Sequence, residues 1–383
     1  MEKSLRLLNN LSPSQFLAEY WQKKPLLIRQ AIPDFKGLLT PDELAGLACE
    51  EHVQSRIVKV VENQWSVDQG PFDEAVFSSL PDTNWSLLVQ SVNHHLPEAA
   101  DLLSQFNFIP HVRLDDLMVS YAPTDGSVGA HVDAYDVFLL QGSGKRRWRI
   151  NTQADLTLIE NAPLAILKHF EAEQEWILES GDMLYLPPNV AHHGIAEDDT
   201  CMTYSIGFRS PKAQELTHAF LEYLQDTSKL NGLYEDPDLT LQKHPAEISA
   251  TMIKKVEAML QKISWTEDSV ADFLGRYMSE PKPDISFEPQ APISVDVLSS
   301  LLAESALQLD LQSQMLFSKD NFYINGESLN VPPIIVNCMQ TLADTKKLNA
   351  TTCNAQMRQA IAVTLQDAYN AGYIQFIHDD LNG

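Results

Sequence analysis

The sequence predicts an α+β fold in which a β-rich core lies between helical segments. Residues 116–209 break into short β-runs at close spacing, whereas the N-terminal third and the part after Ser210 carry helix signals. Close spacing of short strands favours a sandwich or barrel over βαβ units. The length of 383 residues suggests two or three domains.

The N-terminal third begins with two helix signals. Ser12–Gln15 and Thr40–Glu43 each combine an N-cap hydroxyl, a proline at the first helical position and Gln or Glu at the third. Short strands are expected at 56–61 and 64–67. A further helix is expected over 85–96, because its apolar residues share one helical face. These residues are Trp85, Leu88, Val89, Val92 and Leu96.

The β-rich core is divided by Gly- and Pro-containing turns, among them Pro123–Gly126 and Gly142–Gly144. We assign it, with the N-terminal elements, to a first domain of residues 1–210. Its expected strands are 117–122, 136–141, 145–150, 175–178, 183–186 and 200–208.

Residues 211–280 carry three amphipathic helical stripes, compatible with intramolecular packing or with a dimer surface. Residues 281–293 are rich in proline and predict a stiff linker. Residues 294–383 follow the order of a winged helix: helix, strand, a hairpin at 318–321, two helices and a final strand.

The charge balance separates the classes of partner. Lys and Arg number 27 against 52 Asp and Glu, a net charge of −25, which disfavours DNA and RNA and attracts basic proteins. From Ile293 onward, four basic residues face nine acidic ones. The winged helix is therefore expected to contact protein or to be structural, and not to bind nucleic acid.

The spacing of the cysteines and of the apolar residues indicates the cellular compartment. Four scattered cysteines without CxxC spacing argue against a disulfide framework or a zinc ribbon. No apolar run approaches the length of a membrane helix, and the N-terminus lacks a signal-peptide pattern. We expect a cytoplasmic protein without a membrane segment.

The residues that indicate chemistry are His131 and Asp133. Positions i and i+2 of a strand share one face, so both side chains can converge on one ion. His192, after a strand that ends at Pro187-Pro188, completes a 2-His-1-carboxylate triad, which leaves open coordination positions and favours non-haem Fe(II). His193 is an alternative to His192.

An open Fe(II) site needs a co-substrate, and 2-oxoglutarate would bind through its C1 carboxylate and keto oxygen. Its distal carboxylate then needs a buried cation. On the strand 145–150, Trp148 and Ile150 are expected to face the core, and Arg146 shares their face. A buried salt bridge between Arg146 and a protein acid is the alternative. The outward residues of this strand are Lys145, Arg147 and Arg149.

Two positions can form the mouth of the site. Asp116 shares a strand face with Met118, Ser120 and Ala122, and would place a carboxylate where a cationic side chain docks. Tyr135, two residues beyond Asp133 on the same expected strand, could supply an aromatic wall. Both could equally be ordinary rim residues.

Several motifs together match a known family. They are Asp115–Tyr121, Tyr135–Phe138, Gln141–Arg149, Tyr204–Arg209, Phe16–Trp21, Lys23–Arg29, Tyr234–Asp238 and His244–Glu247. They resemble the JmjC-type ribosomal oxygenases, and within these the bacterial YcfD-like ribosomal protein arginine hydroxylases. The resemblance is dense up to about residue 280 and mostly architectural beyond it.

This resemblance implies a double-stranded β-helix (jelly-roll, cupin) core, a helical dimerisation region and a C-terminal winged helix. It implies Fe(II) at His131, Asp133 and His192, with 2-oxoglutarate anchored by Arg146 and O2 as second co-substrate. The implied substrate is an arginine of a large-subunit ribosomal protein, hydroxylated at its β-carbon. Substrate contacts are implied at Asp116, Met118 and Tyr135. Relatives hold the co-substrate with further small polar residues, which correspond here to Ala122 and Thr203.

We therefore expect a cytoplasmic, homodimeric Fe(II)/2-oxoglutarate-dependent arginine hydroxylase that releases succinate and CO2. Histidine hydroxylation or demethylation by the same site, oxidation of a small molecule, and a non-catalytic cupin scaffold are the alternatives.

Overall fold

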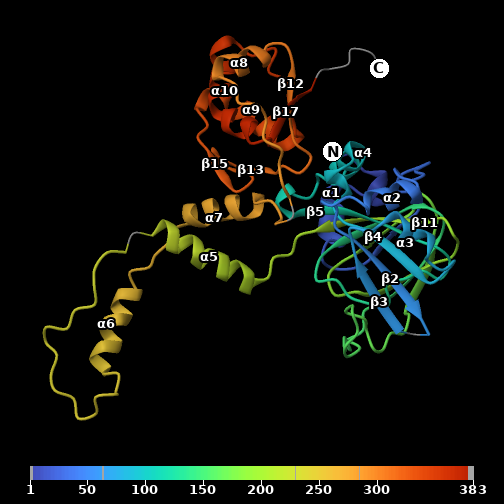
Figure 1. The fold of residues 1–383 in the computed structure, drawn as a ribbon, viewed down its shortest axis with the longest axis horizontal. Helices are drawn as coiled ribbons and strands as arrows, with labels where there is room; N and C mark the ends of the chain where they lie inside the picture. The colour runs from blue at the N-terminus through green and yellow to red at the C-terminus, as the bar shows by residue number, and fades with distance from the viewer. Residues whose placement is uncertain (1–2, 63, 229, 284, 378–383) are drawn as a thin grey trace. The chain divides into compact units, whose positions relative to one another are not determined.

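The computed structural model describes residues 3–62, 64–228, 230–283 and 285–377. It divides into two compact units, one of Met1–Ser210 with Pro283–Ser286 and the other of Pro211–Lys282 with Phe287–Gly383 (Figure 1). Among the described residues, no helix is both long and apolar enough to cross a membrane.

The first unit contains two antiparallel sheets. The larger has the strand order β1-β9-β6-β11-β5-β4-β2-β3 and the smaller the order β10-β7-β8. The strands are β1 (Leu26–Ile28), β2 (Ser55–Val61), β3 (Gln64–Gln69), β4 (Trp85–Val89), β5 (Leu114–Ala122), β6 (Val137–Ser143), β7 (Arg146–Asn151), β8 (Gln174–Leu178), β9 (Met183–Leu186), β10 (Ala191–Ala196) and β11 (Cys201–Phe208).

The larger sheet buries both of its faces, as the alternation along β6 shows. Phe138 and Leu140 pack into a core with the N-terminal helices, whereas Val137 and Leu139 pack with Trp148 of the smaller sheet. The space between the two sheets is the interior of the β-sandwich. The expectation of a sandwich or barrel is confirmed.

The N-terminal helices begin where the sequence predicts. Both expected capping boxes form, at Ser12 with Gln15 and at Thr40 with Glu43. The helices of this unit are α1 (Pro13–Glu19), α2 (Pro41–Leu47), α3 (Glu74–Ser78) and α4 (Pro97–Ser104), with 3₁₀ turns at Arg6–Leu8, Val92–His94 and His111–Arg113. The strands expected at 56–61 and 64–67 are β2 and β3; Asn63, between them, lies outside the described residues.

The helix expected over 85–96 is wrong. Residues 85–89 form the strand β4, and a short 3₁₀ turn follows. All five residues of β4 are buried, because this strand lies inside the larger sheet with both faces covered. A strand buried on both faces shows no alternation of apolar and polar residues. The spacing of its apolar residues therefore also matched one face of a helix.

The second unit begins with three helices, α5 (Ala213–Thr227), α6 (Ala250–Leu260) and α7 (Glu267–Ser279). The winged-helix order expected for the C-terminal part is present, around a core that includes Leu298, Phe322 and Leu365. Its elements are α8 (Val295–Leu301), β12 (Ala306–Leu309), β13 (Met315–Ser318), β14 (Asn321–Ile324), β15 (Glu327–Leu329), a 3₁₀ turn (Pro333–Ile335), α9 (Val336–Thr345), β16 (Lys347–Leu348), α10 (Ala355–Asn370) and β17 (Ile374–Ile377).

Candidate metal centre

His131 and His192 are brought together by backbone pairing. They form an isolated antiparallel bridge, with N–H···O distances of 3.0 and 2.9 Å in the two directions. Directly paired residues place their side chains on the same face. The two imidazole rings accordingly lie with their centroids 4.2 Å apart.

Asp133 joins the two histidines. One ligand atom from each of the three residues lies within 4.8 Å of the others, and Asp133 Oδ2 is 3.5 Å from His192 Nε2. The backbone of this segment is fixed by the Asn189 N–H, which donates to the Asp133 carbonyl at 2.8 Å. In the described part of the chain, this is the one group of three His, Cys, Asp or Glu side chains able to hold a metal ion.

The hydrogen bonds of both imidazoles fix their tautomers. His131 Nδ1 lies 3.0 Å from the Gly129 carbonyl oxygen, and His192 Nδ1 lies 3.0 Å from that of Val190. A carbonyl oxygen only accepts, so each Nδ1 carries the proton and each Nε2 keeps its lone pair for a metal. Burial, and next the proximity of His131, lower the pKa of His192, which keeps this imidazole neutral. The donor set fits a divalent ion such as Fe(II) with open positions.

Three local expectations about these ligands need correction. His131 and Asp133 do not lie on a regular strand but in an irregular segment before β6. Tyr135 therefore shares no strand face with Asp133, although it lies nearby. The strand that ends at Pro187-Pro188 predicts that a turn delivers His192, but His192 lies on the strand β10, which has no counterpart among the expected strands. His193 alternates to the other side and meets Ser127 Oγ at 3.1 Å.

Arg146 lies in the interior of the sandwich, as the alternation along β7 predicts. It is 4% exposed, and Nη1 donates to the hydroxyls of Ser120 and Thr203, both at 3.1 Å. Its Nε is buried without a partner. No carboxylate of a described residue forms a salt bridge with it, so the alternative of a protein ion pair is not supported. The guanidinium also lies over the Trp148 ring, with Cζ 5.5 Å from the ring centroid. A buried guanidinium held by hydroxyls and an aromatic ring fits the carboxylate of a ligand.

The residues that hold Arg146 belong to one hydrogen-bonded row across the larger sheet. Ser120 on β5 pairs with Thr203 on β11, which pairs with Gln141 on β6. Thr203 Oγ1 donates to Gln141 Oε1 at 3.1 Å, which leaves its oxygen free to accept from Arg146. Of the two positions that correspond to small polar residues in relatives, Thr203 contacts Arg146, and whether it contacts the co-substrate stays a prediction. Ala122 cannot form a polar side-chain contact.

Asp116 is buried, and its Oδ2 accepts three hydrogen bonds. Gln90 Nε2 donates at 3.0 Å, the Ser91 hydroxyl at 3.0 Å and the Ser91 N–H at 3.1 Å. All three donors are neutral groups. Gln90 and Ser91 were missed by the sequence analysis, because nothing in their local spacing indicates that they follow β4 at the end beside Asp116.

Met118 and Tyr135 lie near Asp116. Met118 is half-buried on the same face of β5, and Tyr135 is 42% exposed. Withdrawal of its hydroxyl from water, and then the Asp133 carboxylate, raise the pKa of Tyr135, so its hydroxyl stays protonated. The structure thus brings an acid, a thioether and a phenol to the neighbourhood of the three metal-ligand candidates.

Comparisons with known proteins agree with this architecture. A family model described as a JmjC domain matches residues 101–216, and one described as a ROXA-like winged helix matches residues 258–375. The chain is 36% identical over 323 residues to the ribosomal protein uL16 3-hydroxylase of Escherichia coli K12, with 83% of this chain and 85% of that protein covered. It is 41% identical over 237 residues to a probable ribosomal oxygenase of Haemophilus influenzae, with 61% and 56% covered.

Solved structures agree as well. The structure of YcfD, a ribosomal oxygenase from Escherichia coli, superposes with a TM-score of 0.83 at 33% identity, over 99% of this chain and 100% of that one. YcfD has also been solved in complex with cobalt and 2-oxoglutarate, with the same TM-score and 98% of this chain covered. The expected cupin core and winged-helix-like domain are confirmed, whereas the bounds of the four expected segments stay a prediction. By sequence identity over most of both chains, and by the order of its two domains, this protein belongs to the JmjC ribosomal oxygenase family.

Proposed function

We propose that this protein is an Fe(II)- and 2-oxoglutarate-dependent oxygenase that hydroxylates the β-carbon of an arginine in the ribosomal protein uL16. The observation that carries the proposal is one interior with three parts: the His131, Asp133 and His192 group, the unmatched Arg146, and the buried carboxylate of Asp116. A metal, a dicarboxylate and a cationic side chain are the three ligands that these groups suit.

The metal candidates offer two neutral imidazoles and one carboxylate, which would hold Fe(II). When bound, Fe(II) with 2-oxoglutarate supplies the activation of O2 that inserts oxygen into a C–H bond and yields succinate and CO2. The protein's own contribution is to fix the ligand tautomers through Gly129 and Val190, and to exclude water from His192, which is 2% exposed.

Arg146 would hold the distal carboxylate of 2-oxoglutarate. Its position on β7 is close to the metal candidates, since the Trp148 ring on the same face lies 5.8 Å from the His192 ring. Ser120 and Thr203 orient the guanidinium, so it is positioned before the ligand arrives.

Asp116 would pair with the guanidinium of the target arginine, and Met118 and Tyr135 would contact its aliphatic part. The net charge of −25 favours encounter with a basic ribosomal protein. Conversely, neither this charge nor the acidic winged helix suits DNA or RNA, so we expect no nucleic-acid binding.

Two other oxygenase activities use the same kind of metal site. The chain is 21% identical over 211 residues to a fly protein named bifunctional lysine-specific demethylase and histidyl-hydroxylase. The carboxylate of Asp116 favours an arginine over a histidine substrate, because it suits a side chain that is always charged.

The experiment is to incubate the protein with recombinant uL16, Fe(II) and 2-oxoglutarate. We expect mass spectrometry to find one added oxygen atom on an arginine, and fragmentation to place it on the β-carbon. Oxygen on a histidine would instead show histidine hydroxylation. Formaldehyde release from a methylated substrate would show demethylation. Absence of any 2-oxoglutarate turnover with ribosomal proteins would leave the oxidation of a small molecule and the non-catalytic scaffold.

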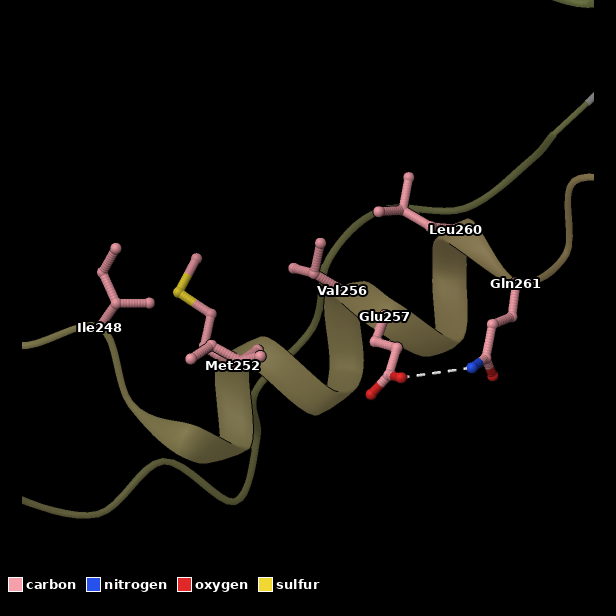
Figure 2. A pocket seen from close by; sticks show the side chains of 7 residues that line it. Ile248, Met252, Val256, Glu257, Leu260 and Gln261 are labelled. Atoms are coloured by element: carbon pink, nitrogen blue, oxygen red, sulfur yellow. Dashed lines mark hydrogen bonds between the residues drawn. The ribbon is translucent and has the colours of Figure 1, made fainter.

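We also propose that the protein is a cytoplasmic homodimer that uses α6. None of the residues of α6 is buried, yet one side of the helix is apolar, as Figure 2 shows for Met252, Val256 and Leu260, and Ile248 before the helix lies next to them. An unburied apolar stripe of this length is typical of a surface that a partner covers. A second copy brings an identical stripe, so the contact can be symmetric.

A further inference from the structure

The interior of the sandwich collects hydrogen-bonding groups that the protein itself does not satisfy. Among the described residues, four buried side-chain atoms have no partner: Arg56 Nε, Ser86 Oγ, Arg146 Nε and Trp148 Nε1. Arg146 and Trp148 share the inner face of β7. A buried polar group without a partner is costly, and such groups gather where a ligand satisfies them.

The strand register places Arg56 on the same interior. Arg56 on β2 pairs with Leu88 on β4, and Leu88 pairs with Ser120 on β5. Paired residues share a face, so Arg56 faces the same side as Ser120, whose hydroxyl meets Arg146. Arg56 is therefore a second inward arginine, on the larger sheet and two strands away from Ser120.

The contacts of Arg56 lie on the side of Met118 and Asp116. Its Nη2 approaches Met118 Sδ at 4.0 Å, and a thioether is only a weak acceptor. Arg56 thus borders the place where the proposed function puts the target side chain.

We propose that Arg56 binds the substrate, by donating a hydrogen bond to a main-chain carbonyl oxygen next to the target arginine. This inference rests on the proposed function and adds a substrate-binding residue to it. Asp116 holds the positive end of the target side chain, and Arg56 holds the peptide from which that side chain projects.

Other occupants fit Arg56 less well. The guanidinium of the target has the same charge and is repelled. The distal carboxylate of 2-oxoglutarate belongs near Ser120, and two strand spacings of ~4.8 Å separate the backbone of Ser120 from that of Arg56. Every peptide carries main-chain carbonyl oxygens, which are neutral acceptors. A hydrogen bond from Arg56 to one of them does not require an acidic side chain in a substrate that is basic.

The first test compares three variants in full-length protein with recombinant uL16 as substrate. Arg56→Met removes all donors, and we expect the KM for uL16 to rise about tenfold or more, while the KM for 2-oxoglutarate is unchanged. Arg56→Lys keeps one charged donor and should restore part of the loss. Lys59→Met is the matched control, because Lys59 lies on the opposite face of β2 and pairs with Asp68 at 2.6 Å. It should leave both KM values unchanged.

The second test identifies the acceptor. A peptide around the modified arginine is made with single carbonyl oxygens replaced by thioamide sulfur, a weaker acceptor. At one position next to the target arginine, the replacement should raise the KM of the wild-type protein. The same replacement should not raise the KM of Arg56→Met further, because this variant already lacks the guanidinium that donates to the carbonyl. Equal losses in both proteins at every position would overturn the assignment of a carbonyl.

The outcomes separate this inference from the proposed function. If the wild-type protein hydroxylates uL16 and Arg56→Met does so with an unchanged KM, only the role of Arg56 is refuted. If Arg56→Met instead raises the KM for 2-oxoglutarate, Arg56 serves the co-substrate and the inference fails. If the wild-type protein modifies no arginine of uL16, both fall together. A purely structural Arg56 would lower the Tm of both Arg56 variants and reduce kcat without a selective change in the KM for uL16.

Discussion

Replacing Arg146 by methionine should separate ligand binding from stability. The guanidinium is 4% exposed, so its attraction for a carboxylate is little screened by water. Loss of one partner of a buried, hydrogen-bonded charge pair costs about 3–5 kcal/mol. The lower figure alone corresponds to a rise of roughly a hundredfold in the KM for 2-oxoglutarate.

The stability of the ligand-free protein should behave differently. The substitution loses the two hydrogen bonds to Ser120 and Thr203, but it also removes a buried cation that has no acid and an unsatisfied Nε. These effects oppose each other, so we expect the free energy of unfolding to change by no more than about 1 kcal/mol.

The assay follows succinate formation against 2-oxoglutarate concentration, with chemical denaturation run in parallel. Arg147→Met is the matched control, because Arg147 is the next residue on β7, points outward and pairs with Glu197 at 2.6 Å. It should leave the KM for 2-oxoglutarate unchanged. An unchanged KM in a folded Arg146→Met protein would refute the reasoning and move the distal carboxylate elsewhere.

Three further substitutions test the remaining parts of the molecule. His131→Ala should abolish turnover and bound iron while circular dichroism stays native; a general loss of folding would make His131 structural. Val256→Asp should convert a dimer into monomers in light scattering, because it places a charge on the apolar side of α6, and an unchanged mass would exclude this surface. Gly275→Ala should lower the free energy of unfolding of the second unit by about 1–3 kcal/mol, because its Cβ would lie 2.2 Å from the Tyr323 ring, whereas Gly46→Ala, with nothing within 4 Å, should not destabilise.

The predicted site rests mostly on signals that are local in the sequence. His131 and Asp133 are two residues apart, and the inward direction of Arg146 follows from its parity with Trp148 and Ile150. The direction of Arg146 follows from strand alternation, which is a property of the backbone. His131 and Asp133 converge although their segment is not a strand, because they are close in sequence and His131 pairs with His192. This is why the three metal-ligand candidates and Arg146 could be named from the sequence, although the strand that carries His192 was missed.

The surroundings of the site depend on strand pairing over long distances. Gln90 and Ser91 reach Asp116 only because β4 lies beside β5, and Arg56 enters the interior only because β2 lies beside β4. The register between strands distant in sequence is set by the packing of whole sheets, not by local spacing. The same limit explains the error over 85–96, since the burial of both faces of β4 depends on what covers it.

The arginines of β7 show why the interior is a binding site and not only a core. Arg147 and Arg149 point outward, and each is paired with a glutamate, Glu175 serving both. Partly exposed pairs of this kind contribute little to stability, because water already screens the charges. Arg146 alternates with them on the same strand, yet it is buried beside hydroxyls and lacks any acid among the described residues. Packing alone would favour an apolar residue at this position, and the carboxylate that we propose as the ligand of Arg146 would explain the arginine.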